Sequence, residues 1–207
     1  MANTQAYNGF LQFYGGAGGA PTFAMTERRI ASGNGTAIYT GDPVMPVVST
    51  ANGYITQASP GTTVLAGIFA GCKYLSTSQK RVIWSNYWPG SDATGDVKAY
   101  IVDDPNAQFL VQCSTTSFCV TGSESTWTSS PLGQYAQFSI GTGNTANGQS
   151  GAYLSSLATT VTFPFIVTDM FISVSNGGDP TSQYNKVVVG FNNEWRRSNG
   201  AGPTGIS

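Results

Sequence analysis

The stretch DVKAYIVD, residues 96–103, decides the fold class of this chain. Its apolar residues Val97, Ala99 and Ile101 occupy every second position, with a lysine and a tyrosine between them. Successive side chains of a β-strand point to opposite faces of the sheet, so this alternation predicts a strand with one buried face. A DDPN turn sequence begins where the stretch ends, which is typical of the end of a strand.

Similar short segments occur on both sides of this strand. They are rich in β-branched and aromatic residues, and turn sequences rich in Gly, Pro, Asn and Asp separate them. They are TAIYT (36–40), VMPVVST (44–50), TVLAGIFAG (63–71), QFLVQC (108–113), TFPFIVT (162–168), MFISVS (170–175) and KVVVGF (186–191). No stretch of helical length keeps a 3.6-residue period free of Gly and Pro. The sequence therefore predicts an all-β protein with very little helix, folded as a single β-barrel, jelly-roll-like or sandwich domain.

The two ends of the chain and one internal stretch differ from the strand-rich part. Residues 1–29 combine aromatic residues with a glycine-rich tract at 15–19, whose backbone is costly to order. We expect an extended N-terminal arm that packs its aromatic residues on a neighbouring subunit or on its own domain; the alternative is a disordered tail. The core domain is expected at 30–195, with an irregular loop at 122–150 and a C-terminal tail at 196–207.

The charge of the chain is low. Charged residues are 9% of the sequence and the net charge is −1. Because binding to nucleic acid requires clustered Lys and Arg, and these are scattered here, we expect no nucleic-acid partner. A weakly charged surface also opposes dense association less than a strongly charged one. The chain has no charged N-terminal region followed by an apolar run and no long apolar stretch, so we expect neither a signal peptide nor a membrane span.

Candidate catalytic residues are few. The chain has no histidine, the commonest general base and metal ligand. Ser150 lies in GQSGA, one glycine short of a nucleophile elbow, and Asp103-Asp104 belongs to a turn. Asp92 and Asp96 offer oxygen ligands that suit calcium but lack the spacing and closing Glu of an EF-hand. The three cysteines form no C-x-x-C pair, so free thiols are expected. We expect a non-enzymatic protein without metal or cofactor.

Aromatic residues gather in the segment IWSNYWPGS (83–91). Aromatic side chains supply large contact areas in cores and at protein interfaces, and they form the floors of sugar-binding sites. Core, interface and sugar platform are therefore the three interpretations of this segment. The residues expected at an interface are Tyr7, Phe10, Phe13, Tyr14, Phe23, Arg28, Arg29, Trp84, Tyr87, Trp88, Trp127, Tyr135, Trp195 and Arg196.

Several segments together resemble a family of capsid cement, or decoration, proteins of tailed bacteriophages. The block at 87–112 is the most specific, and the segments keep the family's order, whereas the N-terminal segment does not follow the usual family opening. The segments are IASGNGTAIYTGDPV (30–44), GIFAGCKY (67–74), YWPGSDATGDVKAYIVDDPNAQFLVQ (87–112), GNTANGQSGAYL (143–154) and YNKVVVGFNNEW (184–195).

The resemblance implies a β-rich, barrel-like or jelly-roll-like core on the outside of a shell of major capsid protein, where it ties neighbouring capsomers together. The implied partners are the phage major capsid protein and further copies of this chain on the lattice. The implied location is the outer capsid surface of the virion, after synthesis in the host cytoplasm. The contacts are expected from the 1–29 arm, the Trp84–Trp88 cluster and the 122–150 loop. The alternative is a carbohydrate-binding or host-adhesion module displayed on the virion, on a head fibre or the tail.

Overall fold

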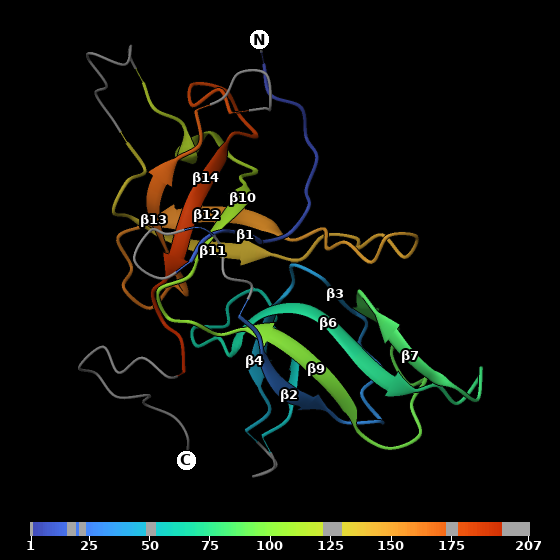
Figure 1. Cartoon of the computed structure of the whole chain (residues 1–207). Helices are drawn as coiled ribbons and strands as arrows, with labels where there is room; N and C mark the ends of the chain where they lie inside the picture. The colour runs from blue at the N-terminus through green and yellow to red at the C-terminus, as the bar shows by residue number, and fades with distance from the viewer. Residues whose placement is uncertain are drawn as a thin grey trace.

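Two antiparallel sheets of six strands each make up most of the protein, as the computed structural model in Figure 1 shows. The structure describes residues 2–15, 20, 24–48, 53–121, 130–172 and 178–195. Sheet A has the order β1 (Leu11–Tyr14), β10 (Gln108–Gln112), β14 (Lys186–Phe191), β13 (Phe165–Met170), β11 (Tyr135–Ser139) and β12 (Tyr153–Ala158). Sheet B has the order β2 (Thr26–Ile30), β9 (Val97–Val102), β6 (Gly67–Leu75), β4 (Pro43–Pro46) and β5 (Ile55–Gln57), and β7 (Val82–Ser85) also pairs with β6. A separate ribbon joins β3 (Ile38–Tyr39) to β8 (Tyr87–Trp88).

The predicted all-β class is confirmed. Among the described residues the only helical element is a short 3₁₀ helix at Thr116–Phe118. Neither sheet closes on itself into a barrel, and the arrangement is consistent with a β-sandwich, one of the predicted architectures. The two sheets occupy the two halves of the molecule in Figure 1, with β10 and β14 in the upper half and β6 and β9 in the lower half.

The stretch with the clearest alternation forms β9. Val97, Ala99 and Ile101 are fully buried, whereas Lys98 is exposed and Tyr100 is half-buried. β9 lies between β2 and β6 and pairs antiparallel with both. The prediction of a strand with one buried face is confirmed, and this strand joins the edge strand β2 to β6, the central strand of sheet B.

The hydrophobic core has two parts that meet at β6. The first part lies against sheet A and is rich in phenylalanine, with Phe10 stacked on Phe165 at 4.4 Å between ring centres. The second part lies against sheet B and contains fully buried Trp88 and Phe69. Because neighbouring residues of a strand face opposite sides, Ile68 belongs to the first part and Phe69 to the second. Sheet B is therefore buried on both faces at this end.

The described part of the N-terminal segment belongs to both sheets and is not a projecting arm. β1 pairs with β10 at the edge of sheet A, and β2 pairs with β9 at the edge of sheet B. Phe10 is only 2% exposed. The described aromatic residues thus pack on the chain's own domain, one of the two possibilities expected, and the boundary predicted at residue 30 falls at the end of β2.

The predicted irregular loop at 122–150 contains a regular strand. Residues Tyr135–Ser139 form β11, and Phe138 belongs to the first part of the core. The prediction was wrong here because Gln137 is buried between Ala136 and Phe138, so this strand lacks the apolar–polar alternation that marks a strand in the sequence. Residues 122–129 and the predicted tail at 196–207 lie outside the described residues.

Candidate protein-interaction surface

Two of the expected interface residues are core residues. Phe10 packs in the first part of the core, and Trp88 is fully buried in the second. Trp88 donates a hydrogen bond from Nε1 to the carbonyl oxygen of Asn34 at 3.1 Å and meets Tyr74 edge to face at 5.1 Å. β8 turns Trp88 inward by pairing with β3, so this tryptophan stabilises the fold and is not available to a partner.

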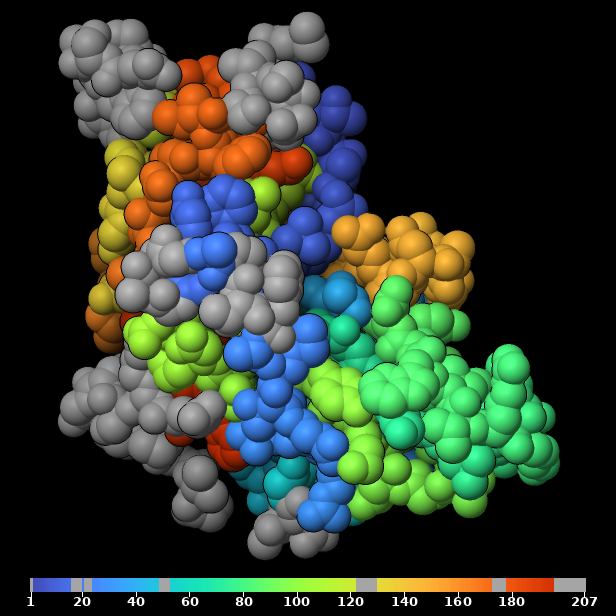
Figure 2. Space-filling view, viewed as in Figure 1, coloured from blue at the N-terminus to red at the C-terminus, as the bar shows by residue number. Residues whose placement is uncertain are grey.

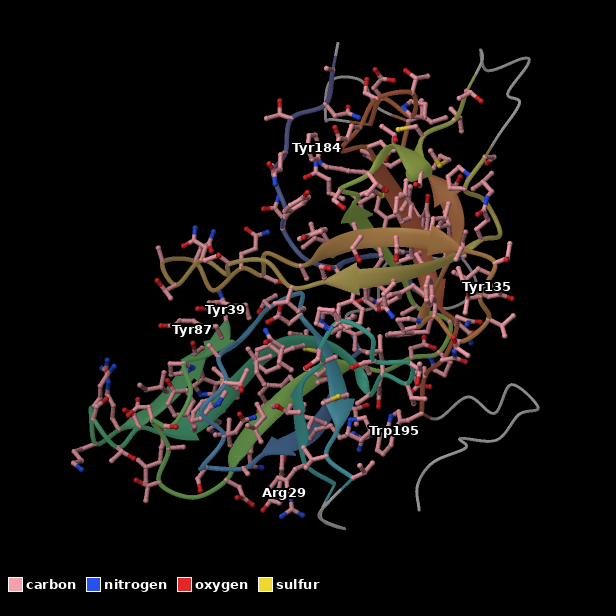
Figure 3. All side chains as sticks on the ribbon, turned by 180° about the vertical axis from the view of Figure 1, so that it is seen from behind. Arg29, Tyr39, Tyr87, Tyr135, Tyr184 and Trp195 are labelled. Carbon is pink, nitrogen blue, oxygen red and sulfur yellow. The ribbon has the colours of Figure 1, made fainter. Side chains whose placement is uncertain are left out.

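Other expected interface residues are half-buried, and their rings stack on rings from other segments of the chain. Tyr7 stacks on Tyr153 at 4.1 Å, and Tyr87 stacks on Tyr39 at 5.3 Å. Figure 3 shows Tyr39 and Tyr87 side by side, whereas Tyr135 lies on the opposite half of the molecule. These residues do not converge on one surface.

The remaining N-terminal aromatic residues also contact the chain's own rings. Phe13 meets Tyr14 at 4.4 Å and Phe171 at 5.8 Å, in both cases edge to face. Both Phe13 and Tyr14 are half-buried beside sheet A. Three further expected residues, Phe23, Trp127 and Arg196, lie outside the described residues.

Adjacent arginines on β2 have different environments. Arg28 faces inward, forms a salt bridge of 3.0 Å with buried Asp103, and lies 4.8 Å above the ring of Trp195. Arg29 faces outward, with 59% of its side chain exposed, and is 3.6 Å from Asp96. In Figure 3 Arg29 projects from the lower edge of the molecule, while Trp195 lies beside the sheet. Arg28 and Trp195 therefore belong to the fold, and only Arg29 is accessible.

Trp84 is the expected interface residue that the structure leaves most open. It is 67% exposed on β7, and Val82 on the same strand and Leu75 on β6 are 55% and 43% exposed. The ring of Trp84 stacks with Tyr100 of β9 at 5.8 Å and 3° between planes, and Lys73 Nζ lies 4.6 Å from its centre. We call these five residues the Trp84 face. Figure 2 shows the green β6–β7 region that carries most of this face protruding from the lower half of the molecule.

Strand register explains how these side chains meet. Trp84 lies opposite Lys73, and Tyr100 lies opposite Gly71, two positions earlier on β6 and on the same face. Because Gly71 has no side chain, the two rings can stack across it. The same face of sheet B carries Ile68 and Val102 at its other end, where the first part of the core covers them. The Trp84 face is therefore the uncovered end of a sheet face that is elsewhere buried.

Sequence reasoning identified Trp84 but not its neighbours on this face. Lys73, Leu75, Val82 and Tyr100 come from three strands, and their proximity depends on strand pairing. The alternation of exposed Val82 and Trp84 along β7 was the available indication, but four residues are too few to assign a face without the register.

Ser150 is a structural residue at the junction of the two sheets. It is buried, and its Oγ donates to Asp42 Oδ1 at 2.5 Å and accepts from the Ala152 backbone N–H at 2.8 Å. Its own N–H donates to the carbonyl of Thr40 at 2.9 Å. With no histidine in the chain, this pair has no imidazole base. The pair instead joins the turn before β4 to the hairpin between β11 and β12.

Asp42 gives the first testable prediction. Burial raises the pKa of Asp42, although hydrogen bonds from Ser150, the Tyr39 N–H and Gln57 act in the opposite direction. Since the folded-state pKa lies above that of the unfolded chain, the folded protein takes up this proton first as the pH falls. The contribution of Asp42 to the free energy of unfolding should therefore become more favourable as the pH falls through its folded-state pKa, and should be least favourable above it.

The measurement compares urea denaturation of the wild type and Asp42→Asn from neutral to mildly acidic pH. The asparagine amide can donate to Ser150 Oγ, and its oxygen can still accept from Tyr39 and Gln57. We expect the free energy of unfolding of the wild type to rise relative to that of the variant on acidification. Carboxylates with lowered pKa values, such as Asp92 and Asp179, cancel in the difference because both proteins have them. Parallel pH profiles would show that Asp42 does not titrate differently on folding.

The other candidate chemical groups are also engaged in the fold. Asp103 faces Arg28, whereas Asp104 accepts from the Asn106 N–H at 2.9 Å in the turn that follows. The three cysteines are free thiols, and burial raises the pKa of Cys72 to about 12, so this thiol stays protonated. Within the described ranges no three His, Cys, Asp or Glu side chains gather as metal ligands do.

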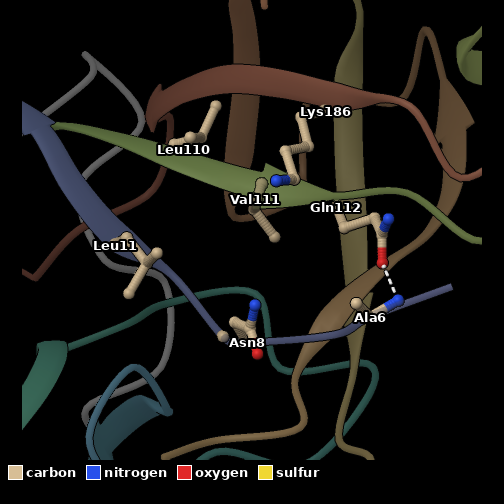
Figure 4. Close-up of a pocket in the computed structure, with 8 residues that line it drawn as sticks. Ala6, Asn8, Leu11, Leu110, Val111, Gln112 and Lys186 are labelled. Carbon is tan, nitrogen blue, oxygen red and sulfur yellow. Dashed lines mark hydrogen bonds between the residues drawn. The ribbon is translucent and has the colours of Figure 1, made fainter. Parts of the chain in front are cut away.

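A crevice between the N-terminal segment and β10 is too small for a substrate. Its volume is about 30 Å³, which suffices for a water molecule but is far below that of ligand pockets. Gln112 lies at one end, where its Oε1 accepts from the Ala6 N–H at 2.7 Å (Figure 4). Its Nε2 donates to the carbonyl of Thr4 at 2.8 Å. The crevice is a packing feature where the N-terminal segment crosses sheet A.

Comparisons with known proteins found no matching family model, no matching curated protein and no matching solved structure. No helix in the described part of the chain is long and apolar enough to cross a membrane. Among the described side chains, the most distinctive accessible feature is the Trp84 face.

Proposed function

We propose that the protein is a capsid cement protein of a tailed bacteriophage, which binds the outer surface of the major capsid protein shell and stabilises contacts between capsomers. The observation that carries this proposal is the Trp84 face, an aromatic and aliphatic surface held by three paired strands. Tryptophan is enriched among the residues that contribute most to protein–protein binding. The resemblance of the quoted segments to cement proteins agrees with such a surface but does not by itself identify the contacts.

The physics of cementing suits this surface. Pressure from packaged DNA separates capsomers, and a subunit that contacts two of them raises the energy of separation. A standard interface buries about 1,600 Å² in total, and repeated contacts across a lattice act through effective concentration, so modest individual affinities suffice. Aromatic and aliphatic contacts also depend less on salt than ion pairs do. On this proposal several copies bind one lattice, at the outer surface of the virion.

The second candidate function is a carbohydrate-binding or host-adhesion module, because an exposed tryptophan can also stack on a sugar ring. Trp84 already contacts Tyr100 and Lys73, which leaves less of its ring face free for a sugar. Val82 and Leu75 are exposed on the same face and extend the apolar surface, which suits a protein partner better. A glycan array distinguishes the two functions, because tight binding that requires Trp84 would favour the sugar platform.

Binding to capsid shells gives the second testable prediction. The purified chain is mixed with expanded empty shells of the major capsid protein encoded with it, and bound protein is measured by sedimentation. We expect Trp84→Ala to weaken binding at least about tenfold, since truncating a central interface tryptophan costs about 2 kcal/mol or more. The fold should be unaffected, because Trp84 is 67% exposed.

Val161→Ala is the matched control for this experiment. Val161 is also exposed, at 61%, but it lies outside the Trp84 face, between β12 and β13. Its truncation should leave shell binding unchanged. Wild-type protein that fails to sediment with shells at micromolar concentration would contradict the proposed function, and equal binding of wild type and Trp84→Ala would place the contact elsewhere.

A further inference from the structure

Strand β7 ends sheet B with a free edge beside the Trp84 face. It consists of Val82–Ser85 and pairs with β6, and no described strand lies on its other side. A free strand edge offers unpaired backbone N–H and C=O groups to any extended chain that approaches it. The edge of β7 is therefore a second binding feature of this surface, distinct from its side chains.

The hydrogen-bond pattern shows which backbone groups face outward. The Ser76 N–H donates to the Arg81 carbonyl at 2.9 Å, so Ser76 and Arg81 form a hydrogen-bonded pair at the turn end of the β6–β7 hairpin. Hydrogen-bonded and non-hydrogen-bonded pairs alternate along an antiparallel ladder, so Ile83 bonds to β6 while Val82 and Trp84 do not. The N–H and C=O groups of Val82 and Trp84 point away from β6 toward the free edge.

The same hairpin gathers cations that have no carboxylate partner within the described residues. These are Lys73, Lys80 and Arg81, whereas the salt bridges of the described part join Arg28, Arg29 and Lys98 to other acidic residues. The nearby carboxylate of Asp92 accepts from Ser76 Oγ at 2.7 Å and from the Ser78 N–H at 3.0 Å, which holds it at the turn. In a chain with a net charge of −1, this hairpin is thus a local positive region.

We propose that the edge of β7 binds an extended segment of a partner protein by strand addition, and that this segment carries carboxylates that meet the cations of the hairpin. The backbone of Val82 and Trp84 supplies the pairing groups, and Arg81 and Lys80 at the hairpin tip supply the charge complement. The proposal rests on the proposed function in one respect: the partner is then the capsid protein of the shell.

A second copy of this chain fits the edge less well than an acidic segment does. Parallel pairing of two β7 strands would set Lys80 and Arg81 of one copy beside those of the other, and like charges at close range oppose association. In antiparallel pairing these cations would face the Ser85 end of the other strand, where the sequence from 82 to 90 offers no carboxylate. Charged residues near an edge strand are a known protection against self-association. The same charges attract an acidic strand, so they can both oppose self-association and favour binding of an acidic partner.

The test has one arm that is independent of capsid shells. A short peptide of alternating valine and glutamate, and its lysine counterpart, are titrated into the full-length chain while amide chemical shifts and hydrogen exchange are followed by NMR. We expect only the acidic peptide to bind, with slowed exchange of the Val82 and Trp84 amides. Val82→Pro removes an outward N–H, a change that an edge strand tolerates. It should weaken peptide binding at least about tenfold. Val82→Thr keeps the N–H and should bind the peptide as the wild type does.

Charge is tested separately, with exposed residues outside β7. Arg81→Glu should weaken binding of the acidic peptide several-fold, and Arg29→Glu, which changes net charge equally but lies on β2 at the other edge of sheet B with 59% of its side chain exposed, should not. Equal binding of both peptides, tighter binding of a single-stranded DNA oligonucleotide, or a dimer that Val82→Pro abolishes would each overturn the proposal.

The shell-binding assay then separates this inference from the proposed function. If wild type sediments with shells and both Val82→Pro and Arg81→Glu sediment equally well, the inference is wrong while the proposed function stands. If wild type binds the acidic peptide at the β7 edge but not the shells, the proposed function is wrong while the edge remains a site for an acidic strand. Loss of both interactions in Val82→Pro, with Val82→Thr intact, is the expected result.

Discussion

Truncation of Phe10 to alanine is expected to lower the free energy of unfolding by about 3–5 kcal/mol, and deletion of residues 2–14 is expected to prevent sheet A from folding. Phe10 is 2% exposed and stacks on Phe165 in the first part of the core. The deletion also removes β1, which covers the edge of β10. Since the free energy of unfolding of a domain is about 5–15 kcal/mol, a loss of this size removes a large part of it. Urea denaturation and near-ultraviolet circular dichroism measure both effects.

Phe13→Ala is the matched control, because Phe13 lies on the same segment but is half-buried. Its truncation should cost clearly less than that of Phe10. A deletion variant that kept the near-ultraviolet spectrum and denaturation midpoint of the wild type would show that the N-terminal segment is an arm after all.

Replacement of Arg28 by methionine is expected to destabilise the fold by about 3–5 kcal/mol, because it removes the cation of a buried ion pair. The Asp103 side chain is 4% exposed and lies 3.0 Å from Arg28. Arg28 also stacks over Trp195 at 4.8 Å, a contact that methionine keeps only in part. Thermal and urea denaturation at neutral pH give the loss directly.

The neighbouring arginine provides the control for this prediction. Arg29→Met removes the same charge from the next residue of β2, but its contact with Asp96 is 3.6 Å long and both side chains are partly exposed. Exposed ion pairs contribute at most about 1 kcal/mol, so this variant should be nearly as stable as the wild type. Equal losses in the two variants would contradict the inward orientation of Arg28.

Local sequence predicted strands well where their pattern is long and regular. The alternation of Val97, Ala99 and Ile101 gave β9 and its buried face because period-two burial is a local property. β11 was missed because its two core residues, Ala136 and Phe138, lie among serine, glycine and glutamine residues that are typical of loops. Short strands in polar surroundings are recognised mainly by their pairing partners, which lie elsewhere in the chain.

Which aromatic residues are buried and which are exposed could not be predicted from the sequence, for the same reason. Trp84 and Trp88 are four residues apart, yet one is 67% exposed and the other is fully buried. Trp88 is turned inward by the pairing of β8 with β3, and Trp84 is placed outward by the register of β7 against β6. Phe10 is buried because β1 pairs with a strand about a hundred residues away. Each outcome depends on long-range register.

The segments that carry the resemblance to cement proteins meet inside the fold. Asp42 from one segment bonds to Ser150 from another, and Asp103 and Trp195 from two further segments both contact Arg28. These segments therefore form junctions that hold the sheets together. Leu75, Val82 and Trp84 of the Trp84 face lie between these segments, whereas Lys73 and Tyr100 lie within them.

On the proposed function, this protein binds the outside of a capsid shell through the Trp84 face. Electron cryomicroscopy of shells decorated with the purified chain tests it most directly, because the map shows both the presence of the protein and its orientation. We expect added density on the outer surface, with the β6–β7 hairpin and Trp84 against the capsid protein. A shell without added density, or bound protein whose Trp84 face is turned to solvent, would contradict the claim.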